Sequence, residues 1–349
     1  MNTTQHNTTP RIEYLDALRG FTMLLVVMTH VSGFALNASS GNYHQYFLQF
    51  RMPLFFFVSG FVFYKDNFKW TLNNIGTFLK KKIPVQIISP FIFLLCYTFF
   101  MNKSLIDALK SPTKIGYWFT FTLFQYFILY ILLQKTFDLF KAKTSWRFAT
   151  LGIIGFLLFN HIPNNFLFRM GFSLQELSLF GLPQMKYFIF FVSGTYIKKY
   201  FKQFEYAIDN TPLTTFAVAT FFLINIFLDT SNINNHISRN ISLLLSLCGI
   251  IIIFSLFRKN KDIFSSDNKI SKSLKFIGKR TLDIYLIHYF FIPFNLYKTF
   301  SFFTENNQPL IEFAASLFIT GLIIIACLTI SSVLRINNTM AHYLFGAKK

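Results

Sequence analysis

An arginine and a histidine lie eleven positions apart near the start of the chain, at Arg19 and His30. A neutral imidazole can take a proton from an alcohol, and a guanidinium can hold phosphate or carboxylate oxygens. If the stretch is helical, eleven residues make almost three turns, so both side chains share one face about 16 Å apart along the axis. Asp16 lies one turn before Arg19 on nearly the same stripe. The spacing predicts a carboxylate–guanidinium pair at one end of a helix and an imidazole deep along it.

Two further basic features follow this stretch. Arg51 opens the next apolar run after a short connection, so we expect it near the level of His30. Lys80, Lys81 and Lys82 form a cluster of point charges suited to phosphate groups. Structural interpretations stay open, because an arginine can anchor a helix end or extend to lipid headgroups, and His30 can be a hydrogen-bonded packing residue.

A second candidate stretch lies near the C-terminus, in a later apolar run. Asp283 follows Arg280 by three positions and can pair with it on a helix. Tyr285 and His288 fall on one helical face, and His288 is the other histidine deep within an apolar run. We treat Asp283, Tyr285 and His288 as additional candidate site residues, with a purely structural role as the alternative for His288.

The elements that must position these residues are membrane helices. The 349 residues are 53% hydrophobic and only 13% charged, well below the roughly 25% charged of soluble domains. A spanning helix needs about 20 mostly apolar residues. Such runs number about ten, so we predict an all-α polytopic membrane protein. The runs are 15–36, 46–64, 83–101, 116–134, 148–164, 183–200, 213–229, 240–257, 279–298 and 309–334.

The placement of charge predicts the topology. Most of the 33 basic residues fall in alternate connections if the N-terminus is cytoplasmic, as the positive-inside rule requires. The C-terminus is then cytoplasmic too. We expect a tail at 1–14, a single membrane domain at 15–334 and a tail at 335–349, in the inner (cytoplasmic) membrane of a cell.

Several other classes are disfavoured. The net charge of +19 follows from this topology, so we expect no nucleic-acid partner. The three cysteines lie within apolar runs without metal-site spacing, so we expect neither a metal nor a disulfide framework. Residues 11–38 have some features of a signal peptide, but Glu13 and Asp16 are unusual in its basic leading segment. The oligomeric state is unknown.

The ordered motifs resemble one known family. Residues 14–20 (YLDALRG) followed by His30 resemble the opening of the acyltransferase family 3 membrane proteins, whose hallmark is an arginine, ten residues and a histidine. Residues 50–60 (FRMPLFFFVSG) are similar to the second-helix motif of a branch resembling fucose 4-O-acetylases. Residues 186–199 and 281–288 are similar to later signatures of that branch. The resemblance covers nearly the whole chain.

The resemblance implies an O-acyltransferase that takes an acyl group, acetyl in the simplest case, from cytoplasmic acyl-CoA to a sugar hydroxyl of a surface glycan or its precursor. Acetyl-CoA is then a donor substrate, and no permanently bound cofactor is implied. His30 would be the general base, Arg19 and Asp16 would hold the donor, and Arg51 would bind the acceptor or stabilise developing charge. The lysines at 80–82 stand where relatives often have arginines, which leaves the contact with the CoA phosphates open.

Transport is the competing function. Ionisable residues inside spanning helices also suit a polysaccharide or oligosaccharide exporter or flippase. The Arg19–His30 stripe favours the acyltransferase, and no convincing inverted repeat supports a transporter.

Overall fold

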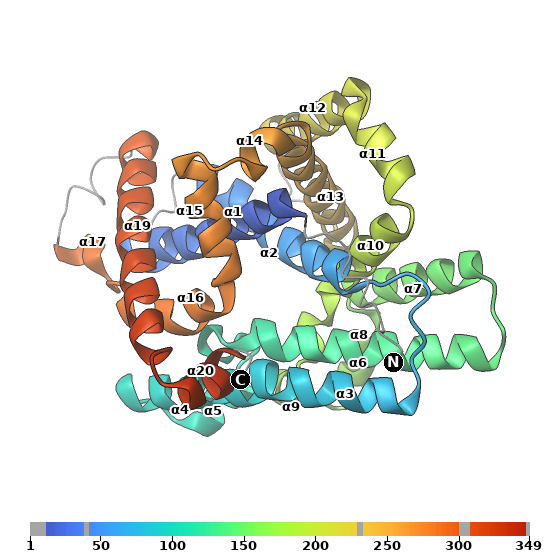
Figure 1. Cartoon of the computed structure of the whole chain (residues 1–349), viewed down its shortest axis with the longest axis horizontal. Coiled ribbons are helices and arrows are strands. Elements are labelled where there is room, and N and C mark those ends of the chain that lie inside the picture. The colour runs from blue at the N-terminus through green and yellow to red at the C-terminus, as the bar shows by residue number, and fades with distance from the viewer. Residues whose placement is uncertain (1–11, 38–41, 229–232, 300–307, 347–349) are drawn as a thin grey trace, which may run out of the picture.

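The computed structural model describes residues 12–37, 42–228, 233–299 and 308–346, and every regular element in these ranges is a helix (Figure 1). This confirms the predicted all-α class. The α-helices are α1 (Glu13–His30), α2 (Asn42–Phe63), α3 (Leu72–Ile83), α4 (Ser89–Phe100), α5 (Leu105–Lys110), α6 (Trp118–Leu139), α7 (Thr144–Phe159), α8 (Ile162–Arg169), α9 (Leu174–Leu179), α10 (Phe188–Lys199), α11 (Phe201–Asp209), α12 (Thr211–Phe227), α13 (Asn235–Lys259), α14 (Lys261–Ser265), α15 (Lys269–Lys279), α16 (Thr281–Ile287), α17 (Leu296–Thr299), α19 (Pro309–Leu334) and α20 (Asn338–Phe345).

Short irregular helices interrupt this order at several points. Two are π-helical and directly continue or join longer helices, and three are 3₁₀ segments. They are η1 (Val31–Ala35, π), η2 (Pro84–Ile88, π), η3 (Lys114–Gly116), η4 (Leu182–Tyr187) and η5 (His288–Phe291). Single π turns occur frequently at functional sites.

Five of the described helical stretches are long and apolar enough to cross a membrane, and two bent pairs raise the number to seven. The bent pairs are α7 with α8, at 53°, and α11 with α12, at 73°. Two expected runs are broken instead: 183–200 forms η4 and α10, and 279–298 forms α16, η5 and α17. The chain is therefore a multi-pass membrane protein, and the count of ten and the side of each terminus stay predictions.

The expected tails are only partly visible. Residues 1–11 of the N-terminal tail lie outside the described residues. In the C-terminal tail, α20 packs against η2 and α4. The boundaries of the tails and of the membrane domain stay predictions.

Helices α1 and α15 cross with their backbones in contact. A Cβ atom on Gly20 would collide with the carbonyl of Leu274, and one on Gly278 would collide with the carbonyl of Asp16. Small residues allow this close approach between membrane helices. The contact fixes the first turns of α1, which carry Asp16 and Arg19.

Helices α2 and α10 meet in the same way. A Cβ on Gly60 would strike the carbonyl of Phe191, and one on Gly194 would strike the carbonyl of Phe57. Each glycine ends a Phe-Val-Ser-Gly segment, one in each helix. The two similar segments therefore pack on each other.

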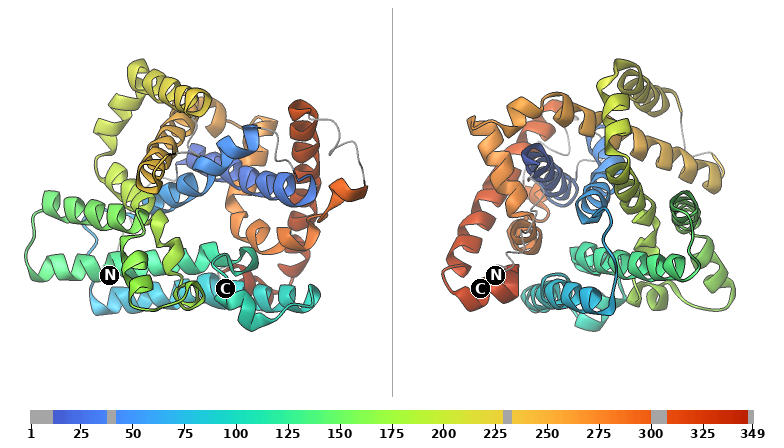
Figure 2. Two further views of the ribbon diagram at one scale, coloured as in Figure 1. Left: turned by 180° about the vertical axis from the view of Figure 1, so that it is seen from behind. Right: turned by 45° about the vertical axis from the view of Figure 1, so that its right-hand side comes forward.

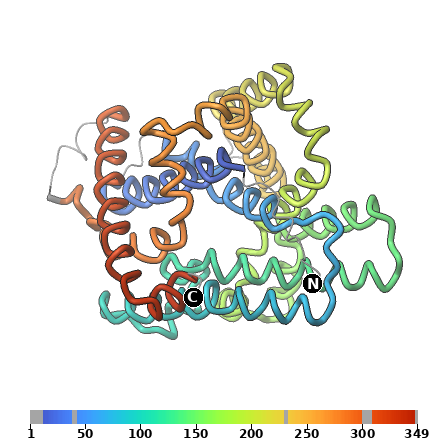
Figure 3. The backbone as a smooth tube through the Cα atoms, viewed as in Figure 1, coloured from blue at the N-terminus to red at the C-terminus, as the bar shows by residue number. Residues whose placement is uncertain are grey.

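The helices are arranged in two layers. In Figures 1 and 2, α1 and α2 run through the middle of the molecule, with α13 and α10 on one side and α19 on the other. The tube in Figure 3 shows α3, α4 and α6 as a separate layer alongside them. The layers are joined through α16 and η5, because α16 contacts α1, α4 and α19.

Candidate active site

The two histidines of the apolar runs meet each other. His30, at the end of α1, places its Nδ1 atom 3.0 Å from Nε2 of His288, the first residue of η5. The Nε2 atom of His30 lies 3.2 Å from the hydroxyl of Tyr289. The three side chains thus form one hydrogen-bonded chain between the first helix and a segment 258 residues away.

The backbone determines how protons are arranged in this chain. Nδ1 of His288 lies 3.0 Å from the carbonyl oxygen of Ile284 and 2.9 Å from that of Tyr285. Both oxygens are acceptors only, so this nitrogen must carry the proton. In a neutral ring, Nε2 of His288 then accepts from Nδ1–H of His30, which leaves Nε2 of His30 with a free lone pair. That nitrogen is the basic one, and the hydroxyl of Tyr289 donates to it.

Irregular backbone surrounds the pair. The π-helical η1 begins directly after His30, and the chain leaves α-helical geometry again at His288. The amide of Asn295 donates to the carbonyl of Phe34 at 3.0 Å and ties the segment after η5 to η1. The ring of Phe34 also packs beside His30, with centroids 5.8 Å apart.

Arg51 of α2 reaches the same level. Its Nη1 atom donates to the hydroxyl of Thr29, the neighbour of His30, and to the carbonyl of Val26 at 3.3 Å. The structure therefore places this guanidinium at the level of the histidine pair. Its Nε–H is buried and has no hydrogen-bond partner within the described part of the chain.

Arg19, near the start of α1, faces the same C-terminal segment that carries His288. Arg19 donates to the hydroxyl of Thr281 at 3.3 Å and lies 3.9 Å from the carboxylate of Asp16. Since Thr281 and His288 belong to one continuous segment, Arg19 and His30 both point toward it. The predicted single face is thus present.

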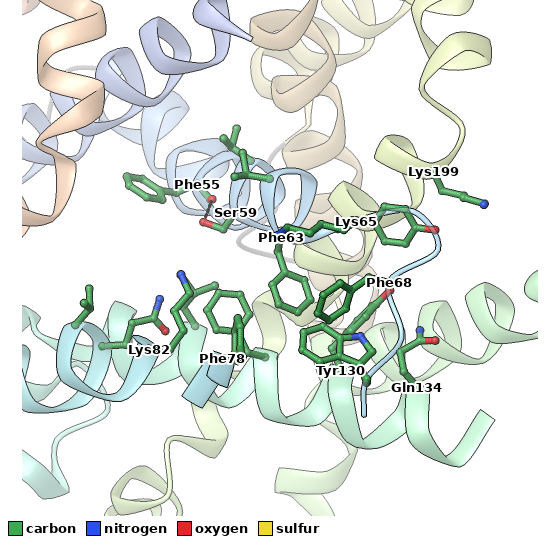
Figure 4. Close-up of a pocket in the computed structure, with 18 of the residues that line it drawn as sticks. Phe55, Ser59, Phe63, Lys65, Phe68, Phe78, Lys82, Tyr130, Gln134 and Lys199 are labelled. Atoms are coloured by element: carbon green, nitrogen blue, oxygen red, sulfur yellow. Dashed lines mark hydrogen bonds between the residues drawn. The ribbon is translucent and has the colours of Figure 1, made fainter. Parts of the chain in front are cut away.

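Arg19 also lines a cavity of about 680 Å³ between the two layers (Figure 4). The lining includes five basic side chains and only two acidic ones. The basic residues are Arg19, Lys65, Lys82, Arg147 and Lys199, and the acids are Asp66 and Asp138. A cavity with this balance suits a ligand with several negative charges.

One end of the cavity is rich in aromatic rings. Trp70 stacks on Phe63 with centroids 5.6 Å apart and an angle of 19° between planes. The ammonium of Lys82 lies over Phe127 at 5.3 Å. Figure 4 shows Phe63, Phe68, Phe78 and Tyr130 grouped between Lys82 and Lys199. Such a surface can stack a flat base next to its phosphates.

Two ion pairs hold basic groups at this end. Lys199 contacts Asp66 at 2.6 Å, and Arg147 contacts Asp138 at 2.6 Å. The hydrogen bond from Lys199 holds the pKa of Asp66, which lies in the connection after α2, below its usual value. Sequence reasoning missed Lys65, Arg147 and Lys199 as cavity residues, although the first two were in connections expected to be cytoplasmic and Lys199 was at the expected cytoplasmic end of a helix.

The predicted lysine cluster divides. Lys82 lines the cavity, whereas Lys80 and Lys81 do not. Adjacent residues on a helix point in different directions, so a run of three cannot face one ligand. Tyr285 does line the cavity; its hydroxyl donates to the carbonyl of Gly116 at 3.0 Å and accepts from an amide of α6 at 3.1 Å.

Asp283 lies in a different environment. It is 1% exposed and accepts two bonds from Arg335, the residue after α19, both at 2.8 Å. It also accepts from Ser331 and pairs with Arg280 at 3.1 Å, the partner expected from spacing. These contacts tie α16 to α19, and Asp283 is not among the residues that line the cavity.

Tyr289 is the other residue that sequence reasoning missed. Its position after His288 carries no spacing signal, and only the tertiary contact with His30 reveals it. Of the predicted residues, Arg19, Lys82 and Tyr285 line the cavity, and His30, His288 and Arg51 lie at the histidine pair. Asp16 lies beside Arg19 but does not line the cavity.

The described residues are those of a multi-pass, helical membrane protein with a histidine pair near a basic cavity, the features of a membrane enzyme. The family model described as an acyltransferase domain matches residues 12–333, and the chain belongs to this family, acyltransferase family 3. It is therefore a membrane acyltransferase, with an acyl donor and an acceptor. No curated protein and no solved structure shows significant similarity to it.

Proposed function

We propose that this protein is an O-acyltransferase of the cytoplasmic membrane that transfers an acetyl group from acetyl-CoA to a sugar hydroxyl of a surface glycan or its precursor. The observation that carries the proposal is the hydrogen-bonded chain from the carbonyls of Ile284 and Tyr285 through His288 to His30. It leaves Nε2 of His30 as a base held in a fixed orientation, which is what an alcohol nucleophile needs.

The donor would enter the basic cavity from the cytoplasm. Its phosphates would contact Lys65, Arg147 and Lys199, and its adenine would stack near Trp70. Arg19 lines the cavity and stands on the same helix as His30, so α1 links the donor region with the base. The long pantetheine arm of CoA suits the separation of these residues along α1.

The chemistry follows from the proton arrangement. The acceptor hydroxyl replaces that of Tyr289 at Nε2 of His30, gives up its proton and attacks the thioester carbon. The C–S bond breaks, the ester C–O bond remains, and the proton on His30 passes to the sulfur to give free CoA. Arg51 would stabilise the negative charge that develops on the carbonyl oxygen, using its unpaired Nε–H.

The test is the acetyl content of the surface glycan. Ester-linked acetyl would be measured by NMR before and after mild alkali in a deletion strain complemented with wild type or His30→Ala at matched expression. We expect acetyl to return with wild type only, because a positioned base contributes about 10²–10⁴-fold. Normal acetylation by His30→Ala would refute the role of His30. Unchanged acetyl with loss of surface glycan in the deletion would instead indicate an exporter.

A covalent route is a separate outcome of the same chemistry. If the acyl group first rests on a residue of the enzyme, purified protein and labelled acetyl-CoA without acceptor would give a labelled chain. Direct transfer predicts no label on the chain.

A further inference from the structure

A buried amide lines the middle of the cavity without a partner. Gln86 lies in the π-helical η2 and is 6% exposed. Its Oε1 atom accepts no hydrogen bond from any described residue, although the side chain lines the cavity. A buried acceptor without a hydrogen bond is energetically unfavourable. A π turn that places such a group on a cavity wall indicates a position where a ligand supplies the missing donor.

The place of Gln86 along the cavity defines which part of a ligand it meets. Phe78, Lys82 and Gln86 line the cavity at successive helical turns. Before Phe78, the chain passes Trp70 at the aromatic and basic end of the cavity. After Gln86, it continues through α4 to Tyr97, whose ring lies 5.9 Å from that of Tyr289. Gln86 thus lies between the end suited to phosphates and the histidine pair.

A second buried polar group lines the cavity from the neighbouring helix. Thr120 of α6 is 3% exposed and lines the same cavity beside Tyr285. Helix α6 packs directly on η2. This part of the cavity wall therefore carries uncharged hydrogen-bonding groups between the cationic end and the histidine pair.

We infer that Gln86, together with Thr120, forms a subsite for the pantetheine arm of the donor. This inference rests on the proposed function. Pantetheine is the neutral part of CoA, with two secondary amides and a hydroxyl, and it joins the phosphates to the thioester. An amide N–H of the arm donates to Oε1 of Gln86. A nucleotide or inorganic phosphate alone offers this neutral stretch no matching group.

The test compares two ligands that share the nucleotide end. CoA and adenosine 3′,5′-bisphosphate would be titrated into wild type and Gln86→Leu in lipid nanodiscs. We expect Gln86→Leu to weaken CoA binding about five- to tenfold, the equivalent of one hydrogen bond, and to leave binding of the bisphosphate unchanged. Gln203→Leu, at an exposed position on α11, is the matched control and should bind both ligands as wild type does.

The outcomes separate this inference from the proposed function. If wild type binds CoA and Gln86→Leu binds it equally well, the subsite is refuted while the proposed function stands. If wild type binds no CoA, the proposed function fails and the subsite with it. If Gln86→Leu weakens the binding of CoA and of the bisphosphate equally, the substitution has disturbed the cavity as a whole. Thr120→Val then repeats the test with a nearly isosteric change. An equal loss of affinity for both ligands in Thr120→Val also refutes the subsite.

Discussion

Replacing His288 tests the proton arrangement at the site most directly. His288→Leu removes the acceptor for Nδ1–H of His30 but leaves His30, Tyr289 and the acceptor space in place. Without that hydrogen bond, the proton on His30 is free to move to Nε2, the nitrogen that must act as the base. We therefore expect a lower kcat with little change in KM for either substrate.

The magnitude follows from the one bond that is lost. A neutral hydrogen bond contributes about 0.5–1.5 kcal/mol, and 1.4 kcal/mol is a factor of ten. The fraction of His30 in the productive tautomer should then fall up to about tenfold, and kcat with it. Loss of the base itself in His30→Ala should cost far more, about 10²–10⁴-fold.

The assay is acetyl transfer by purified enzyme in nanodiscs across a range of pH, with both variants and His288→Gln. The side-chain oxygen of glutamine can accept from Nδ1–H of His30, so His288→Gln should recover most of the activity lost in His288→Leu. A kcat for His288→Leu equal to wild type would refute the tautomer argument. A loss as complete as in His30→Ala, without rescue by glutamine, would instead make His288 the base.

Three further changes test the parts that support the site. Gly60→Ala should lower the thermal midpoint of unfolding, because the added Cβ would meet the backbone of Phe191. Its control is Gly321→Ala, where the added Cβ meets open space; this variant should raise the midpoint slightly, because alanine has the higher helix propensity. Asp283→Asn should cost about 2–3 kcal/mol of stability, somewhat less than breaking a fully buried ion pair, because the arginines that contact Asp283 are partly exposed. The kcat of the folded variant should be retained. A stable but inactive variant would instead give Asp283 a direct role in the reaction. Asp66→Asn should tighten CoA binding about two- to fivefold by releasing Lys199. Because the pKa of Asp66 is lowered, its ion pair with Lys199 is lost only as pH falls through that lowered value. The tightening of CoA binding by Asp66→Asn should therefore be the same at pH 5 and pH 8. A strong change between these two pH values would contradict the role given to the Asp66–Lys199 pair.

The parts of the site that lie within one helix could be predicted from the sequence. Arg19 and His30 are related by helical geometry alone, and the structure keeps them on the face that meets the segment from Thr281 to His288. Periodicity is sufficient there because the relation is local.

Relations between distant segments could not be predicted. Nothing in the spacing joins His30 to His288 or Tyr289, and nothing separates Lys82 from its two neighbours before the cavity is known. The same limit applies to Asp283, whose partner Arg335 lies 52 positions away, just after α19. The number of spanning helices was obscured for another reason: hydropathy does not distinguish one straight helix from a 3₁₀ turn followed by a short α-helix, as in η4 and α10.

The end of α16 shows why the break in this segment matters for chemistry. The last carbonyls of a helix lack amide partners from the helix itself. At the end of α16 the amide of His288 still donates to the carbonyl of Ile284. Side chains donate to the carbonyls that follow: the hydroxyl of Tyr117 donates to that of Leu286 at 2.9 Å, and Nδ1 of His288 donates to that of Tyr285 as well as to that of Ile284. An uninterrupted helix would use the oxygens of Tyr285 and Leu286 for its own amides. Because α16 ends here, the carbonyl of Tyr285 is available to orient His288, and through it the base on α1.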